Sequence, residues 1–498
     1  MRVLFKNVRT VEASEPITLH AEDGRWTPVA FSEREADTVV DVEGGFVLPG
    51  FVDCHCHVLP MGLDLQAVDL SGCWTREEVL RTIADAAASH EEGWLLAVQY
   101  DQTRFPDGSH LTIAELDPVT KGIPTILRHS SGHAAVVNSA VLQIAGIEAE
   151  TEDPPGGEIV RDSNGRPLGP LLENAMGLAY RAAPKPTVAQ MRDAILAAQR
   201  RLRSLGITCA NDMATGSRGL EAELAAYRMA AEERMCRTRL TILWERVFGE
   251  GGEQPSLETP PEWLRVYGIK LFADGAIGAG TAAMTEEYVT GGRGMLIYEP
   301  EELAEKVRTA DSAGYRVAIH SIGDRSTATV LDAIESTPRP SRHRVEHVMV
   351  LDANLIERIQ RLGIAVTLQP EFLLRFGHAY KRQLGAERAA RLKPLRTLRQ
   401  AGIPVGLSSD LPIVPGDPWD GIRTAAARPE GFDQEENLTL EEAVEGYTRG
   451  AALANGDEDQ GALGAGCWAD FQVYDKDPLQ HPDAKLVGTF VAASAGEG

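Results

Sequence analysis

Short apolar runs rich in β-branched residues alternate along the chain with longer stretches rich in Ala, Arg, Glu and Leu. Eight such runs follow Gly50, and from the second onwards each is preceded by a helix-like segment. The runs cover residues 51–58, 207–213, 240–247, 266–274, 315–324, 342–350, 364–370 and 403–410. Eight strands that alternate with helices predict an α/β fold of the (β/α)8 barrel type, in which active sites lie at the carboxyl ends of the strands.

Two regions do not fit a bare barrel. The gap after the first run, about 62–200, is too long for one crossover and has its own strand and helix patterns, with a hairpin signal at Asn164-Gly165. It predicts an inserted α+β subdomain. Residues 1–50 and 456–498 also have strand-like patterns, so we expect strands from both termini to pair into one small sheet domain. The barrel would then span 51–455 and carry the insertion.

Composition indicates a folded protein that acts on small molecules. Hydrophobic residues make up 43% of the 498 residues and charged residues 24%, which is typical of a soluble globular chain. The net charge of −24 repels phosphate backbones and anionic lipids, which argues against nucleic acid and membranes as partners. No stretch approaches the roughly 20 apolar residues of a membrane helix, and the N-terminus has no leader pattern.

The six cysteines show no disulfide-framework spacing. They predict free thiols and a cytoplasmic location. The oligomeric state is open, with a homodimer as the default expectation.

The first run, "FVDCHCHV", contains two histidines in a segment that reads as a buried strand. Side chains alternate along a strand, so Asp53, His55 and His57 share the face that would line the barrel interior. Two neutral imidazoles one pleat apart can bind the same ion. The alternative is a pair of buried histidines with ordinary hydrogen-bond partners.

Other runs end in residues of the same chemistry. His320 and His347 lie late in the fifth and sixth runs, and Asp410 ends the eighth. Because carboxyl ends of barrel strands meet at one rim, these side chains would converge with the first two histidines. The remaining histidines show no comparable pattern. The sequence therefore predicts a divalent-metal site at the rim.

Lys270 interrupts the apolar run "VYGIKLFAD". An isolated ammonium is costly to bury, and burial lowers the pKa of a lysine. The neutral amine that results can take up carbon dioxide as a carbamate, an anion able to bridge two metal ions. The alternatives are a lysine that extends to solvent and one that pairs with a carboxylate such as Asp274.

Six motifs resemble those of the amidohydrolase superfamily: "LPGFVDCHCH", "IKLFADGAIG", "AIHSIGDR", "RVEHV", "LSSDLPI" and "GALGAGCWADFQVYDKDP". The resemblance is to the amidohydrolase-3 group, which is similar to YtcJ-like hydrolases and N-substituted formamide deformylases. It spans nearly the whole chain, and the motifs follow the family's order. It implies a distorted barrel, a small β-sandwich built from both ends, and one or two divalent ions at the barrel mouth.

The same resemblance implies a ligand set. The ligands would be His55, His57, Lys270, His320, His347 and Asp410. His55 and His57 would hold the more buried ion, and His320 and His347 would hold the second ion. Lys270, as a carbamate, would bridge the two ions. Zn²⁺ is the default ion for a histidine-rich site.

The chemistry expected from this set is metal-dependent hydrolysis. A divalent ion lowers the pKa of bound water from about 15.7 to about 7. Asp410 would accept the proton and return it to a leaving nitrogen, and His320 is the second predicted catalytic residue. We expect a metal-activated hydroxide to cleave a non-peptide C–N bond in a linear amide, such as an N-acyl or N-formyl amine. A cyclic amide or a heterocycle undergoing deamination, and a non-catalytic barrel protein, are the alternatives.

The sequence does not identify the substrate. This chain has "SSGH" where relatives commonly have "DGH", and "SSDLPI" where they often have Trp after the Asp. Both segments are expected near substrate. The candidate substrate contacts are Arg128, His133, Asp274 and Trp244.

Overall fold

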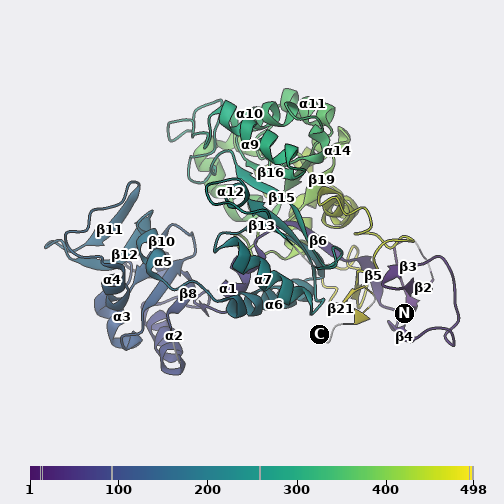
Figure 1. Ribbon diagram of the computed structural model, residues 1–498, viewed down its shortest axis with the longest axis horizontal. Coiled ribbons are helices and arrows are strands. Elements are labelled where there is room, and N and C mark those ends of the chain that lie inside the picture. The colour runs from purple at the N-terminus through teal and green to yellow at the C-terminus, as the bar shows by residue number, and fades with distance from the viewer. Residues whose placement is uncertain (12, 14, 91–92, 257–258, 493, 496–498) are drawn as a thin grey trace. The chain divides into compact units, whose positions relative to one another are not determined.

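The computed structural model describes residues 1–11, 13, 15–90, 93–256, 259–492 and 494–495. The chain divides into two compact units, one of residues 1–59 and 195–498 and the other of residues 60–194. The first unit contains an eight-stranded barrel and two smaller sheets, and the second contains a six-stranded sheet with its own helices (Figure 1).

The barrel consists of eight parallel strands joined in the order β6-β13-β14-β15-β16-β17-β18-β19. Their bounds are β6 (Phe51–Cys56), β13 (Ile207–Thr215), β14 (Arg237–Leu243), β15 (Leu264–Phe272), β16 (Arg316–Ser321), β17 (Arg344–His347), β18 (Ala365–Leu368) and β19 (Val405–Leu407). Each overlaps one predicted run, so the predicted barrel is confirmed. The strands are buried along almost their whole length, as expected of a parallel sheet covered on both faces.

The barrel is nearly closed between its first and last strands. The Asp410 N–H donates to the His55 carbonyl at 2.8 Å, and the His57 N–H donates to the Leu411 carbonyl at 2.8 Å. These bonds join the carboxyl end of β6 to the segment that follows β19. The closure therefore brings the His-x-His motif beside Asp410.

Helices follow or precede the barrel strands. Two of them, α1 (Val58–Leu65) and α6 (Val188–Ser204), contain the boundaries between the units. The others are α7 (Leu220–Ala231), α8 (Trp244–Val247), α9 (Pro300–Ser312), α10 (Asp324–Glu335), the 3₁₀ turn η2 (Pro340–Arg342), α11 (Ala353–Leu362), α12 (Glu371–Leu384), α13 (Ala386–Ala390), α14 (Leu395–Gln400), α15 (Pro418–Ala426), η3 (Gln434–Glu436), α16 (Leu440–Glu445), the π-helical turn η4 (Gly446–Gly450) and α17 (Ala451–Ala454).

Helix α11 illustrates how local sequence sets these elements. The Asp352 side chain accepts a hydrogen bond from the Leu355 N–H at 2.8 Å, which caps the first turn. Leu355 and Ile359, spaced by one turn, are the buried residues of the helix. Gly363 ends it at φ +65°, a left-handed conformation that costs glycine little.

Strands from both termini form a sandwich of two four-stranded sheets. One sheet has the order β3-β2-β1-β4 and the other β22-β21-β20-β5, in which β5 pairs antiparallel with β20. Phe5, Trp26, Val47 and Phe471 share its core. The strands are β1 (Arg2–Val8), β2 (Ile17–Glu22), β3 (Arg25–Trp26), β4 (Thr38–Asp41), β5 (Phe46–Pro49), β20 (Phe471–Tyr474), β21 (Leu486–Val491) and β22 (Ser494–Ala495).

The second unit is a mixed sheet of order β11-β12-β10-β9-β8-β7. The predicted hairpin is confirmed between β11 and β12, with Gly165 at φ +80° in its turn. The elements are β7 (Val68–Asp69), α2 (Arg76–Ser89), β8 (Leu95–Tyr100), η1 (Gln102–Arg104), α3 (Ile113–Thr120), β9 (Thr125–His129), β10 (Ala134–Val137), α4 (Ser139–Ala145), β11 (Gly157–Arg161), β12 (Pro167–Glu173) and α5 (Met176–Ala182).

Two further predictions concern the chain as a whole. All six cysteines are free, as their spacing predicts. Among the described residues, no helix has both the length and the apolar character needed to cross a lipid bilayer.

Candidate metal centre

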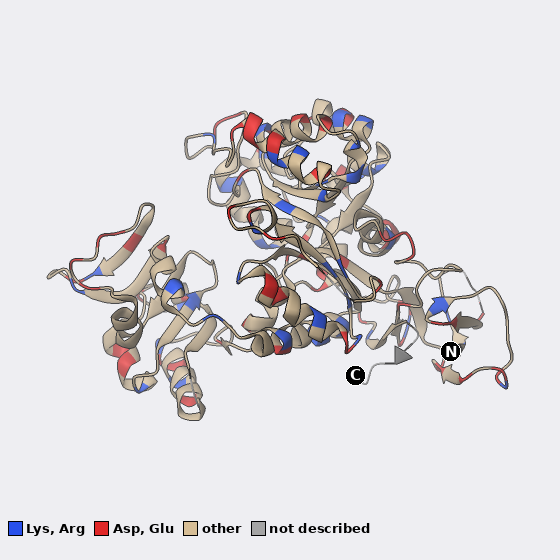
Figure 2. Cartoon of the chain, in the orientation of Figure 1, with Lys and Arg blue, Asp and Glu red and all other residues tan. Residues whose placement is uncertain are grey.

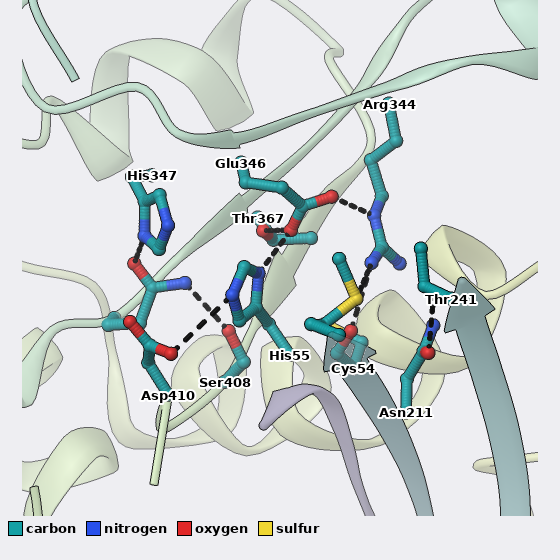
Figure 3. Close-up of polar contacts among 12 residues, drawn as sticks. Cys54, His55, Asn211, Thr241, Arg344, Glu346, His347, Thr367, Ser408 and Asp410 are labelled. Carbon is teal, nitrogen blue, oxygen red and sulfur yellow. Dashed lines mark hydrogen bonds and ion pairs between the residues drawn. The ribbon is translucent and has the colours of Figure 1, made fainter. Parts of the chain in front are cut away.

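Four histidines and one aspartate meet at the carboxyl ends of the barrel strands. Figure 3 shows His55, His347 and Asp410 of this group. One potential ligand atom each from His55, His347 and Asp410 lies within 4.8 Å of the other two. The His57 Nε2 is 3.1 Å from the Asp410 Oδ1, and the His320 ring centroid is 4.6 Å from that of His347. Residues from β6, β16, β17 and the segment after β19 are therefore brought together as the sequence predicts.

Hydrogen bonds define which nitrogen is free in three of the four imidazoles. The His55 Nδ1 lies 2.6 Å from a Glu346 carboxylate oxygen, and the His347 Nδ1 lies 2.8 Å from the Gln369 Oε1. Both partner oxygens are acceptors, so each Nδ1 is the donor and each Nε2 retains its lone pair. The His320 Nε2 lies 3.0 Å from a backbone carbonyl, that of Gly275, which leaves the Nδ1 of this ring free.

The imidazoles of His55, His320 and His347 are neutral at neutral pH. Burial, reinforced by the positive charge of Lys270, holds the pKa of His55 well below its ordinary value. Burial and the same lysine lower the pKa of His320 to about 4. Burial and the neighbouring histidines depress the pKa of His347 strongly as well. Neutral imidazole is the form that binds metal, and these rings need no deprotonation to do so.

The arrangement leaves one carboxylate oxygen without a hydrogen bond. Among the described residues, the buried Asp410 Oδ1 accepts none, although the Nε2 atoms of His57 and His55 lie 3.1 Å and 3.5 Å away. Burial would raise the pKa of Asp410, but the nearby histidines and Lys270 outweigh it, and the pKa lies below its usual value. The ionised Asp410 Oδ1 and the lone pair of the His55 Nε2 face each other at 3.5 Å, and a cation bound between them would stabilise both. The nitrogen and oxygen donors suit a divalent ion of the zinc type.

Backbone strain is concentrated at the same place. His347 (φ +74°), Val348 (φ +32°) and Asp410 (φ +62°) all adopt left-handed conformations. This conformation is unusual for residues with a side chain, and most of all for a β-branched valine, and it costs about 1–3 kcal/mol per residue. The strain directs two potential ligands into the centre.

Lys270 lies in β15 and is only 1% exposed. Burial lowers its pKa to about 8, against the opposing effect of the Glu346 and Asp410 charges. The two alternatives left open by the sequence are both wrong. The side chain does not reach solvent, and no carboxylate of the described residues, Asp274 included, lies within ion-pair distance of its ammonium. A buried amine with a lowered pKa is the state that carbamate formation requires.

The carboxylate of Asp274, a predicted substrate contact, is hydrogen-bonded to backbone N–H groups. Its carboxylate accepts hydrogen bonds from the N–H groups of Ile322 (3.0 Å), Ala283 (2.9 Å) and Gly323 (2.9 Å). Burial raises the pKa of Asp274 to about 6 despite these donors. The visible role of this residue is to hold the segments after β15 and β16, and a substrate contact stays a prediction.

Trp244 begins α8, directly after β14. Its Nε1 donates to the Lys306 carbonyl at 3.2 Å, and the Lys306 ammonium lies 3.6 Å from its ring centroid. The indole is therefore engaged by α9. Its predicted contact with substrate is untested.

Arg128 and His133, the other predicted substrate contacts, belong to the second unit. Arg128 forms an ion pair with Asp64, and the His133 Nδ1 lies 2.9 Å from a Glu173 carboxylate oxygen. These contacts lie within that unit. The proposed substrate role of both residues stays a prediction.

The sequence pattern missed four residues that support the centre. Arg344 is fully buried and donates to Glu346 at 2.6 Å, while Thr367 donates to the second oxygen of the same carboxylate. Gln369 holds His347, and the buried Lys393 ammonium lies 3.4 Å from the Gln369 Oε1. Arg344 was detectable as a charged residue two positions before Glu346 in an apolar run. Gln369 and Lys393 have no comparable signal.

The barrel and this donor set define a hydrolase-type site, and comparison with known proteins places it in a family. The chain belongs to the amidohydrolase family, whose model matches residues 38–494. It is 32% identical over 461 residues to a protein of Bacillus subtilis (strain 168) named amidohydrolase YtcJ, covering 90% of this chain and 87% of that one. It is 28% identical to the N-substituted formamide deformylase of Arthrobacter pascens, covering 98% and 95%.

A solved structure has the same fold over nearly the full length. An uncharacterized metal-dependent hydrolase from Pyrococcus horikoshii OT3 superimposes with a TM-score of 0.82 at 25% identity, covering 96% of this chain and 98% of that one. The family predicted from the motifs is thereby confirmed, and the protein is a hydrolase of that family.

Proposed function

We propose that this protein is a metal-dependent amidohydrolase that cleaves the C–N bond of a linear amide, an N-acyl or N-formyl amine, in a small molecule. The observation that supports it most directly is the unpaired Asp410 Oδ1 among imidazole nitrogens. The name of the Arthrobacter pascens relative agrees with an N-formyl substrate.

The proposed cofactor is Zn²⁺, as one or two ions. His55, His57 and Asp410 would hold the first, His320 and His347 the second, and an N-carboxylated Lys270 would bridge them. A bound zinc ion supplies two things, a water whose pKa is lowered to about 7 and a Lewis acid for the substrate carbonyl.

Within this site, Asp410 is the group able to move a proton. Its carboxylate is ionised, buried and free of hydrogen bonds at Oδ1. It would accept the proton of the attacking water and return it to the leaving nitrogen. His320 would use its free Nδ1 to hold the second ion, so its proposed catalytic role is to keep that ion in place beside the substrate.

A substrate panel tests the proposal. Zinc-loaded protein is incubated with N-formyl and N-acyl amines, cyclic amides and amino-heterocycles, and the released amine or ammonia is measured. We expect turnover of linear amides that chelator treatment abolishes and added zinc restores. Turnover of cyclic substrates alone would replace the proposed substrate class, and activity unaffected by metal removal would refute the mechanism.

The state of Lys270 gives a separate prediction. Protein prepared with ¹³C-bicarbonate and zinc should show a carbamate carbon signal in its NMR spectrum, because the buried amine has a lowered pKa and ions to bind the product. Lys270→Ala should lose this signal and bind less zinc than the wild type. A zinc-saturated wild type without the signal would contradict the bridging role.

Lys393 gives a third test, because it acts at a distance from the ligands. Its ammonium and His347 donate to the same Gln369 oxygen, so it fixes the orientation of the amide and with it the free nitrogen of His347. Lys393→Met should lower zinc affinity about 10- to 100-fold, the usual effect of losing such support. Chelator competition measures it, with Lys381→Met as the control. Unchanged affinity would exclude this positioning role.

A further inference from the structure

A pocket of about 310 Å³ lies at the amino-terminal ends of the barrel strands. Arg265 is the second residue of β15, Arg316 is the first of β16, and Arg342 ends the turn η2 just before β17. Tyr267, Tyr315 and Asn455 also line it. The proposed metal ligands lie at the opposite ends of the same strands, five residues further along in β15, or roughly 16 Å at strand spacing.

Donor groups around this pocket lack acceptors. Among the described residues, the guanidinium of Arg316 forms no hydrogen bond or ion pair. The Arg265 Nε and the Asn455 Nδ2 are buried and likewise unpaired. Asn455 is fully buried, and its Oδ1 accepts from Asn211 (2.9 Å) and Arg344 (3.0 Å), which fixes the amide. Buried donors without a partner are rare and costly in folded proteins.

The backbone makes room for the free arginine. A Cβ at Gly456 would come within 2.4 Å of an Arg316 guanidinium nitrogen, and Gly456 itself has φ +67°. The guanidinium therefore packs on the glycine, beside Asn455. This contact restricts the side chain and holds its charge at the pocket.

The positive charge is not balanced locally. Asp457 is shared between Arg239 and Arg265, and Asp311 lies 3.5 Å from Arg342. The pKa of His343, next to this cluster, falls to about 4 through burial and the nearby arginines, against the opposing effect of Asp311. Acidic and basic residues are interspersed over most of the chain, whose net charge is −24 (Figure 2). An arginine-lined pocket departs from that distribution.

We propose that this pocket is a second binding site, distinct from the metal centre, for a phosphate group, either free or carried by a small molecule. Planar guanidinium groups match the several acceptor oxygens of phosphate, and the unpaired guanidinium of Arg316 would be satisfied by it. The pocket volume is at the lower end of the range for small-molecule sites, so a phosphomonoester of a small metabolite fits the space.

Titration calorimetry of the zinc-loaded full chain tests the site. Inorganic phosphate and glycerol phosphate are compared at constant ionic strength against chloride. We expect saturable binding, and a melting temperature that rises with ligand concentration. Arg316→Gln should weaken binding about tenfold or more, since a charge-assisted hydrogen bond is lost. Arg361→Gln, which removes an exposed arginine in α11, is the matched control and should bind as the wild type does.

The design separates this pocket from phosphate bound at the metal centre. Phosphate bound at the metal is retained by the Arg316→Gln variant and lost from metal-free protein. Phosphate bound in the pocket is lost from the Arg316→Gln variant and retained by metal-free protein. Arg342→Gln, in a surface turn, repeats the test if the first variant does not fold. Binding of glycerol phosphate alone would identify a phosphomonoester as the ligand, and binding of both probes would identify the phosphate group itself. Affinity that is unchanged in both arginine variants, or no binding beyond the chloride control, would overturn the proposal.

Discussion

Replacing Asp410 by Asn is expected to lower kcat about 100- to 10,000-fold with a much smaller loss of bound zinc. The amide preserves the size of the side chain and one oxygen, but it has no capacity to take up and return a proton. The imidazoles of His55 and His57, which lie 3.5 Å and 3.1 Å from the carboxylate oxygen, are still present to bind metal. Steady-state kinetics and metal analysis of the same preparation measure the two effects.

A matched control separates the proton transfer from general loss of charge. Asp420→Asn changes an acidic residue of α15 that pairs with Arg375 and is outside the centre. It should retain the kcat and zinc content of the wild type. A kcat for Asp410→Asn within a few-fold of the wild type would exclude Asp410 as the proton-transfer group, whatever the metal content.

Glu346→Gln is expected to lower both stability and zinc affinity. The Glu346 side chain is fully buried between the Arg344 guanidinium and the His55 ring, each 2.6 Å from one of its oxygens. The amide leaves Arg344 as a buried charge without a counter-ion, which costs about 3–5 kcal/mol. Because the amide has one acceptor oxygen where the carboxylate has two, either Arg344 or His55 then faces an N–H group. The support of His55 is weakened, and zinc affinity should fall about 10- to 100-fold. Thermal unfolding and chelator competition measure these effects.

The double variant Arg344→Met/Glu346→Gln tests the cause of the instability. Removing both charges takes away the uncompensated guanidinium, so part of the lost stability should return while zinc affinity stays low. Glu335→Gln, at an exposed position paired with Arg358 and Arg361, is the control and should change stability little. A single Glu346→Gln variant that melts like the wild type would show that this ion pair contributes no net stability.

Much of the candidate site could be predicted because its residues lie at regular places in the strands. His55 and His57 are one pleat apart in β6, and His320 and His347 lie at or next to the ends of β16 and β17. Parallel strands in a barrel place such ends at one rim, so the position in the strand was enough to predict that they meet. The burial of the Lys270 side chain was not predictable in this way, because it depends on all the segments that pack around this residue.

The contacts that support the proposed metal ligands could not be predicted from the sequence, for a related reason. Arg344 donates to the carbonyl of Cys54, 290 positions earlier, and Lys393 reaches Gln369 from the segment between α13 and α14. Such contacts join segments with no shared periodicity. Their partners exist only once the barrel has closed.

Local patterns of apolar and polar residues were therefore sufficient for the barrel, for strands at both ends of the chain and for the rim histidines, since strand alternation and helix periodicity are short-range properties. Only the tertiary structure decided which imidazole nitrogen is free, that Lys270 is buried and forms no ion pair within the described part of the chain, and that arginines from three separate segments line one pocket. These features depend on burial and on hydrogen bonds between distant segments, and both arise from the packing of the whole chain.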